Sequence, residues 1–439
     1  MLGSARSACH GAGVTDSLTT PTSPLQIGDY RRYWLARFMG VFATMSMVVL
    51  LGYQLYAVAR DDYGMSIGEA SFQLGLLGLA QFIPLFVLTP VAGLAADRFD
   101  RRHVAAFANG IDGLVAVLLA ALTYADALNL PVLFALAAAH GAARVFLGPS
   151  MSAIAPNIVP PRLLPRAIAL SSIAWQTASV AGPAVGGLVF AAIPWAPHAL
   201  SAVLLGCGMI LILTVRPVRA AQDGPKLKPL KQIAQGMIFV WRERFLLGCI
   251  TLDLFAVLLA GATALLPVFA RDILFVGPEG LGLMRAAPAV GAAAVALWLS
   301  FRPLQREVGV KMLWAVAAFG ALTVVFALSR SFALSLAILS MMGAVDMISV
   351  FIRSSLVQLF TPDDKRGRVS AISGLAISAS NELGEMQSGL AAGLLGAVGA
   401  VVFGGMGAIV VTLVWAWYFP ELRRARSFEP QELKREVST

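Results

Sequence analysis

The chain has 439 residues, of which 58% are hydrophobic and only 13% charged. A soluble domain normally carries about a quarter charged residues, so this composition argues against a soluble enzyme. The formal net charge is +9, but the basic residues lie on short turns between apolar segments. That placement argues against a nucleic-acid partner. Composition therefore predicts a protein that crosses a lipid bilayer many times.

Twelve segments are long and apolar enough to cross a bilayer, because a span needs about 20 mainly apolar residues. Helices are the expected form, since a helix leaves no unpaired backbone group in lipid. The expected spans cover residues 34–58, 72–95, 104–124, 130–153, 168–191, 198–215, 245–269, 281–299, 312–328, 334–356, 369–395 and 398–419.

The longest internal loop separates six expected spans from the other six. The expected parts are a tail over residues 1–30, a six-helix bundle over 31–216, a linker over 217–244, a second bundle over 245–419 and a tail over 420–439. In the linker, apolar residues recur at helical spacing, which favours an amphipathic helix on the membrane surface over a plain solvated linker. The first tail has no short apolar core with a cleavage site, so a removable signal peptide is not expected.

Basic residues are distributed unevenly between the two sides of the expected spans. If the amino terminus is cytoplasmic, the outer loops hold only Arg60, Arg271 and Arg330, and almost all other Lys and Arg lie in inner loops and tails. Positively charged loops stay in the cytoplasm, so both termini are expected there, in a bacterial inner membrane.

The two halves of the chain also resemble each other. Pro160 and Arg166 recur as Pro362 and Arg368 at one constant offset, which corresponds to six spans. Repeated six-span halves with a site between them at mid-membrane are typical of secondary transporters. The expected fold class is therefore an all-α membrane protein with twelve transmembrane helices in two pseudo-symmetric six-helix halves.

Residues 93–102 (GLAADRFDRR) form an acidic and basic turn directly after an apolar span. They resemble the loop between spans two and three of the major facilitator superfamily, with Asp100 where that family usually has glycine. A carboxylate in such a turn can bond to a helix amino terminus and pair with arginine, which locks one state of a carrier. The alternative is a solvated turn. The gating residues expected here are Gly93, Asp97, Arg98, Arg101 and Arg102.

Further motifs carry the same resemblance. Residues 144–148 (RVFLG) resemble the family's fourth-span motif, and residues 178–187 (ASVAGPAVGG) resemble the fifth-span signature of its antiporter and exporter branches. Residues 148–170 and 366–389 are similar to the branch that contains the enterobactin exporter and macrolide efflux proteins. In the fifth span, close helix contact and a bend are expected. The residues expected to allow them are Gly182, Pro183, Gly186 and Gly187.

Ionisable residues inside the spans are the candidates for the transport site, because a charge at mid-membrane costs at least about 2.5 kcal/mol. In the fold that the motifs resemble, spans one, four, seven and ten line the central cavity. The expected substrate and proton-coupling residues are Arg144, Asp253, Asp346, Arg353, Glu382 and Glu385. An arginine among them would hold an anionic group of the substrate or influence the protonation of a carboxylate. Asp112 is expected to lie farther from the central cavity. His140 is expected to be a packed structural residue rather than a group that titrates during transport.

No motif supports enzyme chemistry. A phosphate-binding loop of the nucleotide-hydrolase kind is absent, and the four histidines have no metal-site spacing, so neither a cofactor nor a metal is expected. The expected function is proton-coupled export of a small organic molecule, siderophore-like or drug-like, by a monomeric carrier. Three alternatives stay open: an importer of the same fold, a lipid flippase, and a membrane sensor that does not transport.

Overall fold

The computed structural model describes residues 21–217, 229–302, 304, 306–362 and 365–428. Within these ranges every regular element is a helix, which confirms the expected fold class. Eleven helices of this part of the chain are long and apolar enough to cross a membrane. The last of them is α13 (Arg366–Tyr418), which bends at Gly396. Gly396 has a φ of 74°, which is not helical but which glycine adopts readily, so it divides α13 into two helical arms. These two arms are the expected eleventh and twelfth spans.

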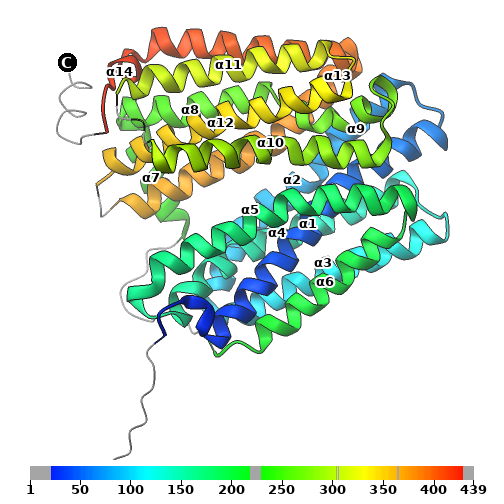
Figure 1. Ribbon diagram of the computed structural model, residues 1–439, viewed down its shortest axis with the longest axis horizontal. Coiled ribbons are helices and arrows are strands. Elements are labelled where there is room, and N and C mark those ends of the chain that lie inside the picture. Colours follow the sequence, from blue (N-terminus) through cyan, green and yellow to red (C-terminus); the bar gives the residue numbers. More distant parts are fainter. Residues whose placement is uncertain (1–20, 218–228, 303, 305, 363–364, 429–439) are drawn as a thin grey trace, which may run out of the picture.

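The helices form two bundles (Figure 1). The first bundle contains α1 (Gly28–Asp61), α2 (Ile67–Arg98), α3 (Arg101–Tyr124), α4 (Leu130–Ile158), α5 (Leu164–Ala192) and α6 (Ala196–Leu213), with short 3-10 turns η1 (Pro24–Gln26) and η2 (Pro161–Leu163). The second contains α8 (Arg244–Leu259), η3 (Ala262–Leu265), α9 (Leu266–Val268), η4 (Phe269–Ile273), α10 (Gly277–Phe301), α11 (Val308–Leu328), α12 (Phe332–Phe360), α13 and α14 (Pro420–Arg424).

Packing in the two bundles follows the sequence repeat. Arg166 lies in the first turn of α5, and Arg368 lies in the first turn of α13. A Cβ atom on Gly182 of α5 would lie 2.5 Å from the Phe42 carbonyl oxygen of α1. A Cβ atom on Gly384 of α13 would lie 3.0 Å from a backbone oxygen of α8. Small residues thus bring the fifth span against the first, and the eleventh against the seventh, at equivalent places in the two halves.

The bundles contact each other at the end of the molecule where α1 ends and α10 begins, which we call the far end. Here α5 crosses α10 so closely that a Cβ atom on Gly187 would lie 3.1 Å from the Gly282 Cα atom. A second close contact joins α2 to α13, where a Cβ atom on Gly75 would lie 2.9 Å from the Gly389 Cα atom. The expected close contact of the fifth span is therefore present, and it joins the two bundles.

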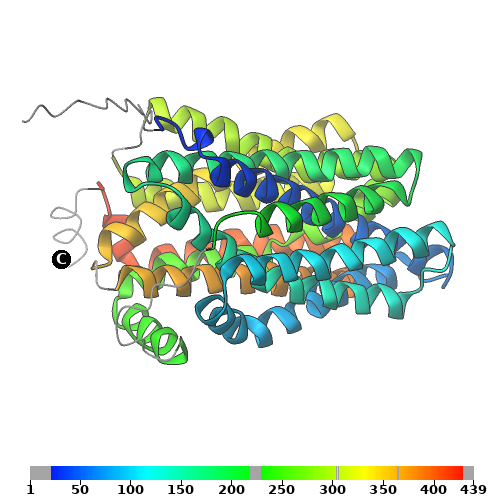
Figure 2. The same ribbon diagram turned by 90° about the horizontal axis from the view of Figure 1, so that it is seen from below.

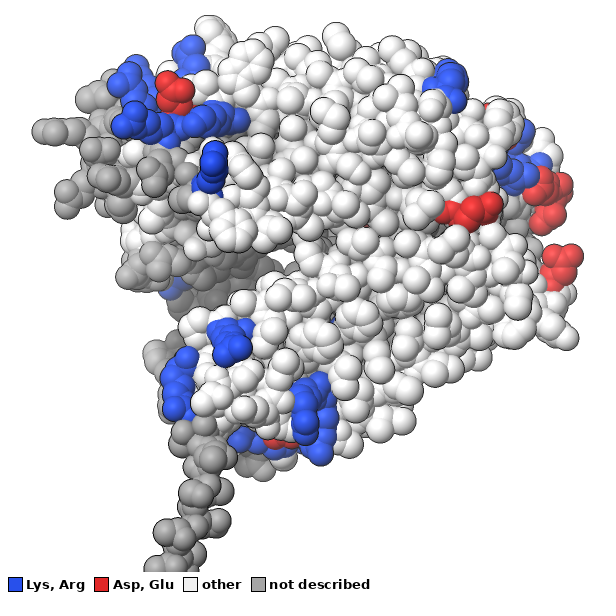
Figure 3. Space-filling model, in the orientation of Figure 1, with Lys and Arg blue, Asp and Glu red and all other residues white. Residues whose placement is uncertain are grey.

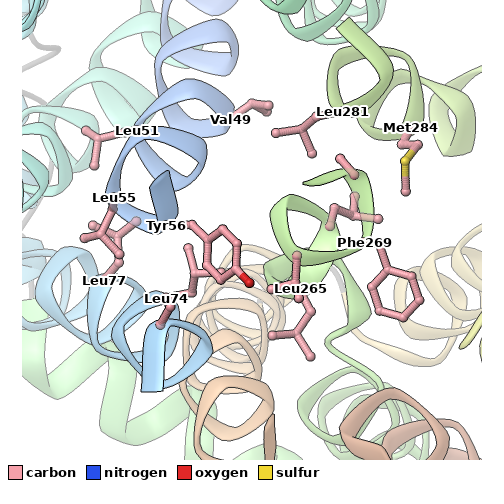
Figure 4. Packing of buried hydrophobic residues seen from close by; sticks show 14 of the residues in the cluster. Val49, Leu51, Leu55, Tyr56, Leu74, Leu77, Leu265, Phe269, Leu281 and Met284 are labelled. Carbon is pink, nitrogen blue, oxygen red and sulfur yellow. The ribbon is translucent and has the colours of Figure 1, made fainter. Parts of the chain in front are cut away.

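Buried apolar side chains fill the junction at the far end. Figure 4 shows Tyr56 of α1 and Leu74 of α2 facing Leu265 of the second bundle. Polar contacts between the bundles add to this junction. The Tyr56 hydroxyl donates to Asp272, and the Arg271 guanidinium lies 2.5 Å from the Asp61 carboxylate.

At the opposite end, where α1 begins and α13 ends, the bundles stand apart. We call this the terminal end. Figure 3 shows the surface hollowed between the bundles there, with Lys and Arg gathered around the opening. Figure 2 shows α7 (Pro229–Arg242) beside the bundles at the same end. This helix occupies part of the expected linker, whose residues 218–228 lie outside the described ranges, and Gly236 packs on the Arg368 carbonyl oxygen of α13.

The seventh span differs from the expectation of one continuous helix over 245–269. The α8 helix ends at Leu259, and the chain continues through the short elements η3, α9 and η4. Pro267 lacks the amide hydrogen that would bond to the preceding turn, so a regular helix is interrupted here. A Cβ atom on Gly261 would also lie only 2.7 Å from the Gly384 carbonyl oxygen. The break thus lets α13 approach the seventh span at mid-membrane.

Candidate functional site

A central cavity lies between the two bundles, about halfway along the helices. Its volume is about 360 Å³. This volume lies near the lower end of the range of typical ligand pockets, about 300–1,000 Å³, so the cavity accommodates a small organic molecule. Its charged lining residues are Arg144, Arg285, Asp346, Glu382 and Glu385.

Two ion pairs cross this cavity. Arg144, in the middle of α4, lies 3.5 Å from the Glu382 carboxylate on α13, so this pair joins the two bundles. Arg285 of α10 lies 4.0 Å from the Glu385 carboxylate on the same face of α13. The Arg285 guanidinium also donates to the Thr263 carbonyl oxygen at 3.3 Å. Both pairs are loose, so a substrate or a proton can replace one partner without breaking a short hydrogen bond.

Asp253 and Arg353 form a third ion pair, between α8 and α12. Both residues are buried. The sequence predicted them on the substrate path, but neither is among the residues that line the described cavity. Their charges act instead on Asp346, whose charged neighbours are Asp253 and Arg353. Their direct role in transport stays a prediction.

Asp112 and His140 lie away from the cavity, in the first bundle. The His140 Nδ1 atom is 2.5 Å from an Asp112 carboxylate oxygen, and both side chains are fully buried. The Thr44 hydroxyl of α1 donates to the other carboxylate oxygen at 3.3 Å. These contacts tie α1, α3 and α4 together, which agrees with the expected peripheral place of Asp112.

Sequence reasoning missed several residues of the cavity. Arg285 was not among the expected site residues, yet it lines the cavity and lies 4.0 Å from the Glu385 carboxylate. Gln81 and Asn381 add uncharged polar groups to the lining. Asn381 directly precedes Glu382, and Gln81 is a polar residue in an otherwise apolar stretch, so polar residues at mid-span were the available signal.

The turn after α2 holds the start of α3 in place. Asp100 caps α3: its carboxylate accepts from the Arg102 backbone amide at 3.0 Å and lies 2.7 Å from the Arg102 guanidinium. Partial burial opposes ionisation, but the hydrogen bonds from Arg102 outweigh it and hold the pKa of Asp100 below its usual value. Arg102 also donates to the Leu213 carbonyl oxygen at 3.2 Å, at the end of α6. The residue that departs from the family pattern is therefore the amino-terminal cap of α3.

Of the other expected gating residues, Arg101 is the first residue of α3. Arg98 ends α2 and is exposed, and a side chain at Gly93 would have no neighbour within 4 Å. The Asp97 side chain lies outside the described residues. In α5, a Cβ atom on Gly186 would clash with Ser46 of α1, and the Pro183 carbonyl oxygen packs on Gly282. The α5 residues therefore lie at close helix contacts, and the gating role of both the turn and α5 stays a prediction.

Replacing Asp97 by asparagine is expected to reduce turnover while folded protein remains in the membrane. The neutral side chain keeps nearly the same shape but loses the charge that is expected to pair with arginine, so the expected loss is conformational. Substrate binding to purified protein should therefore survive better than the transport rate. Normal turnover would identify the turn as a solvated charge cluster.

Solved transporters share this fold. A bacterial homologue of the human lysosomal transporter Spinster, in an inward-facing and unoccupied conformation, matches with a TM-score of 0.68 at 14% identity, over 95% of this chain and 99% of that one. A D-xylose-proton symporter matches with a TM-score of 0.64 at 14% identity, over 89% and 97% of the two chains. At these identities the likeness shows the fold alone.

Sequence comparison identifies the family. The enterobactin exporter EntS of Shigella boydii serotype 18 is 24% identical over 411 residues, covering 92% of this chain and 94% of that protein. EntS of Escherichia coli is 24% identical over 413 residues, with the same coverage. The sequence profile of the Major Facilitator Superfamily matches residues 33–385. The chain therefore belongs to the Major Facilitator Superfamily and is a multi-pass membrane transporter.

Proposed function

We propose that this transporter exports a small organic molecule across a bacterial inner membrane in exchange for protons. The observation that carries the proposal is the charge of the central cavity, whose lining holds three carboxylates but only two guanidinium groups. A carboxylate in excess at mid-membrane is costly when it is ionised, and a proton removes that cost. The cavity can thus bind either a proton or a substrate group that replaces it.

The direction of transport rests on two further arguments. The positive-inside rule assigns the basic terminal end to the cytoplasm, where an exporter collects and an importer releases its substrate, and the likeness of residues 178–187 to the signature of antiporters and exporters favours export. The relatives named enterobactin exporters support the same direction. The volume of the cavity favours a compact organic molecule of the siderophore or drug type.

Orientation is tested by thiol labelling in intact cells, in a variant without the native cysteines. Cysteines introduced singly at Ser17 and Ser427 should resist a membrane-impermeant reagent, because both sites are expected in the cytoplasm. A cysteine at Asp62, which is exposed at the far end, should react. The reverse labelling pattern would contradict the proposed topology.

Function is tested first by comparing small molecules inside and outside cells with and without the protein. An exporter should lower the internal amount of its substrate and raise the external amount, whereas an importer would do the opposite. The purified protein is then placed in proteoliposomes. Counterflow of the identified substrate should appear there, and its absence would favour a membrane sensor. Movement of labelled lipid between leaflets would favour a flippase.

A further inference from the structure

Asp346 differs from the other acids of the central cavity in its surroundings. Glu382 lies opposite Arg144, Glu385 lies opposite Arg285, and behind the lining Asp253 pairs with Arg353. Asp346 lines the cavity from the middle of α12, yet within the described ranges no cation lies within 4.0 Å of its carboxylate and no hydrogen bond to it is present. It is therefore the cavity acid that still needs a partner.

The surrounding charges do not supply that partner. The helices around the cavity contribute Arg144 from α4, Arg285 from α10, and Glu382 and Glu385 from α13. The groups that act directly on Asp346 are Asp253 of α8 and Arg353 of α12. Three acids pair with three arginines, so one negative charge is left over at Asp346 when every group is ionised. On α4, His140 is already paired with Asp112 and does not contribute.

We infer that a cationic group of the substrate and a proton compete for Asp346, so that the substrate is an amphipathic organic cation such as a hydrophobic amine. The inference rests on the proposed proton exchange and deepens it. The apolar remainder of such a molecule fits the apolar part of the lining, which includes Met45, Val48, Val257, Phe319, Leu339 and Met342. Phe319 supplies an aromatic ring, which attracts cations as well as apolar groups.

The direction of coupling supports a cation over an anion. A cation that pairs with Asp346 expels the proton, so substrate and proton bind in turn, as exchange requires. An anion that pairs with Arg144 or Arg285 would instead leave Glu382 or Glu385 without its counter-charge. Proton and anion would then bind together, which produces co-transport in one direction. Proton exchange and an anionic substrate are therefore incompatible at these pairs.

The test uses two probes of the same shape and opposite charge. Tetraphenylphosphonium and tetraphenylborate each carry four phenyl groups on a charged central atom. Binding of each to the purified full-length protein is measured by titration calorimetry in detergent, with empty micelles as the blank. Titrations in two buffers with different heats of ionisation report the protons released. The variant is Asp346→Asn, and the matched control is Asp62→Asn at the exposed far end.

Tetraphenylphosphonium should bind, release a proton, and bind more weakly as the pH falls. Asp346→Asn should weaken this binding by about tenfold or more and abolish the proton release, because a close charge pair in a cavity is lost. Asp62→Asn should bind as the native protein does. Binding of tetraphenylborate alone, binding of neither probe, or unchanged proton release in Asp346→Asn would each overturn the inference.

These outcomes are separable from those of the proposed function. If cells and proteoliposomes show proton-coupled export but tetraphenylphosphonium does not bind, the substrate class is wrong and the function stands. If tetraphenylphosphonium binds at Asp346 and releases a proton but no export occurs, the function is wrong and the competition at Asp346 stands.

Discussion

Replacing Asp346 by asparagine is expected to abolish uphill export while substrate exchange continues at saturating substrate. Asparagine stays neutral throughout the cycle, so it cannot carry a proton across the membrane. Exchange of substrate on the two sides needs no net proton movement and should survive. The measurement is transport in proteoliposomes that enclose a pH dye, with and without an imposed proton gradient.

The same assay applies to the three other acids at mid-membrane. Asp253→Asn, Glu382→Gln and Glu385→Gln each remove one member of an ion pair and leave an arginine without its counter-charge. We expect these variants to lose coupling less selectively than Asp346→Asn, since folding and substrate binding suffer as well. Normal coupling in all four variants would exclude these carboxylates, and His140 or a different ion would become the next candidate.

Replacing Gly187 by valine is expected to hold the far end open. Only when the bundles touch there does a side chain at Gly187 meet the Pro278 carbonyl oxygen and the Gly282 backbone. Such overpacking costs about 1–3 kcal/mol, which shifts the balance between the two states by about 5–150-fold. Transport should fall by a similar factor, because the carrier can no longer alternate freely.

Thiol labelling measures this shift directly. In a variant without other cysteines, Leu266→Cys places a thiol in the buried junction at the far end. Its reaction with an impermeant reagent should be much faster when Gly187→Val is also present. The control is Gly206→Val on α6, where a Cβ atom would have no neighbour within 4 Å. Equal labelling in both variants would show that the glycine contact does not control the far end.

Local sequence patterns predicted much of the fold and part of the site. Apolar length alone identified the twelve spans, because the bilayer requires each span to satisfy its own backbone. The recurrence of Arg166 as Arg368 predicted two equivalent halves, and both residues lie in the first turns of equivalent helices. The cost of charge in lipid pointed to Arg144, Asp346, Glu382 and Glu385, all of which line the central cavity.

The sequence by itself determined which residues are too costly to leave in lipid, because that cost depends on residue type and depth. Which of them meet was decided only by the tertiary structure. The pairing of Arg285 with Glu385 and of Asp112 with His140 depends on which helix faces which, and on the rotation of each helix about its axis. The choice of facing helices and their rotation follow from close packing at small residues such as Gly187. The residues that pack there are far apart in the chain. Among the described residues Asp346 has no cation partner for the same reason, because the packing of α8 against α12 pairs Arg353 with Asp253.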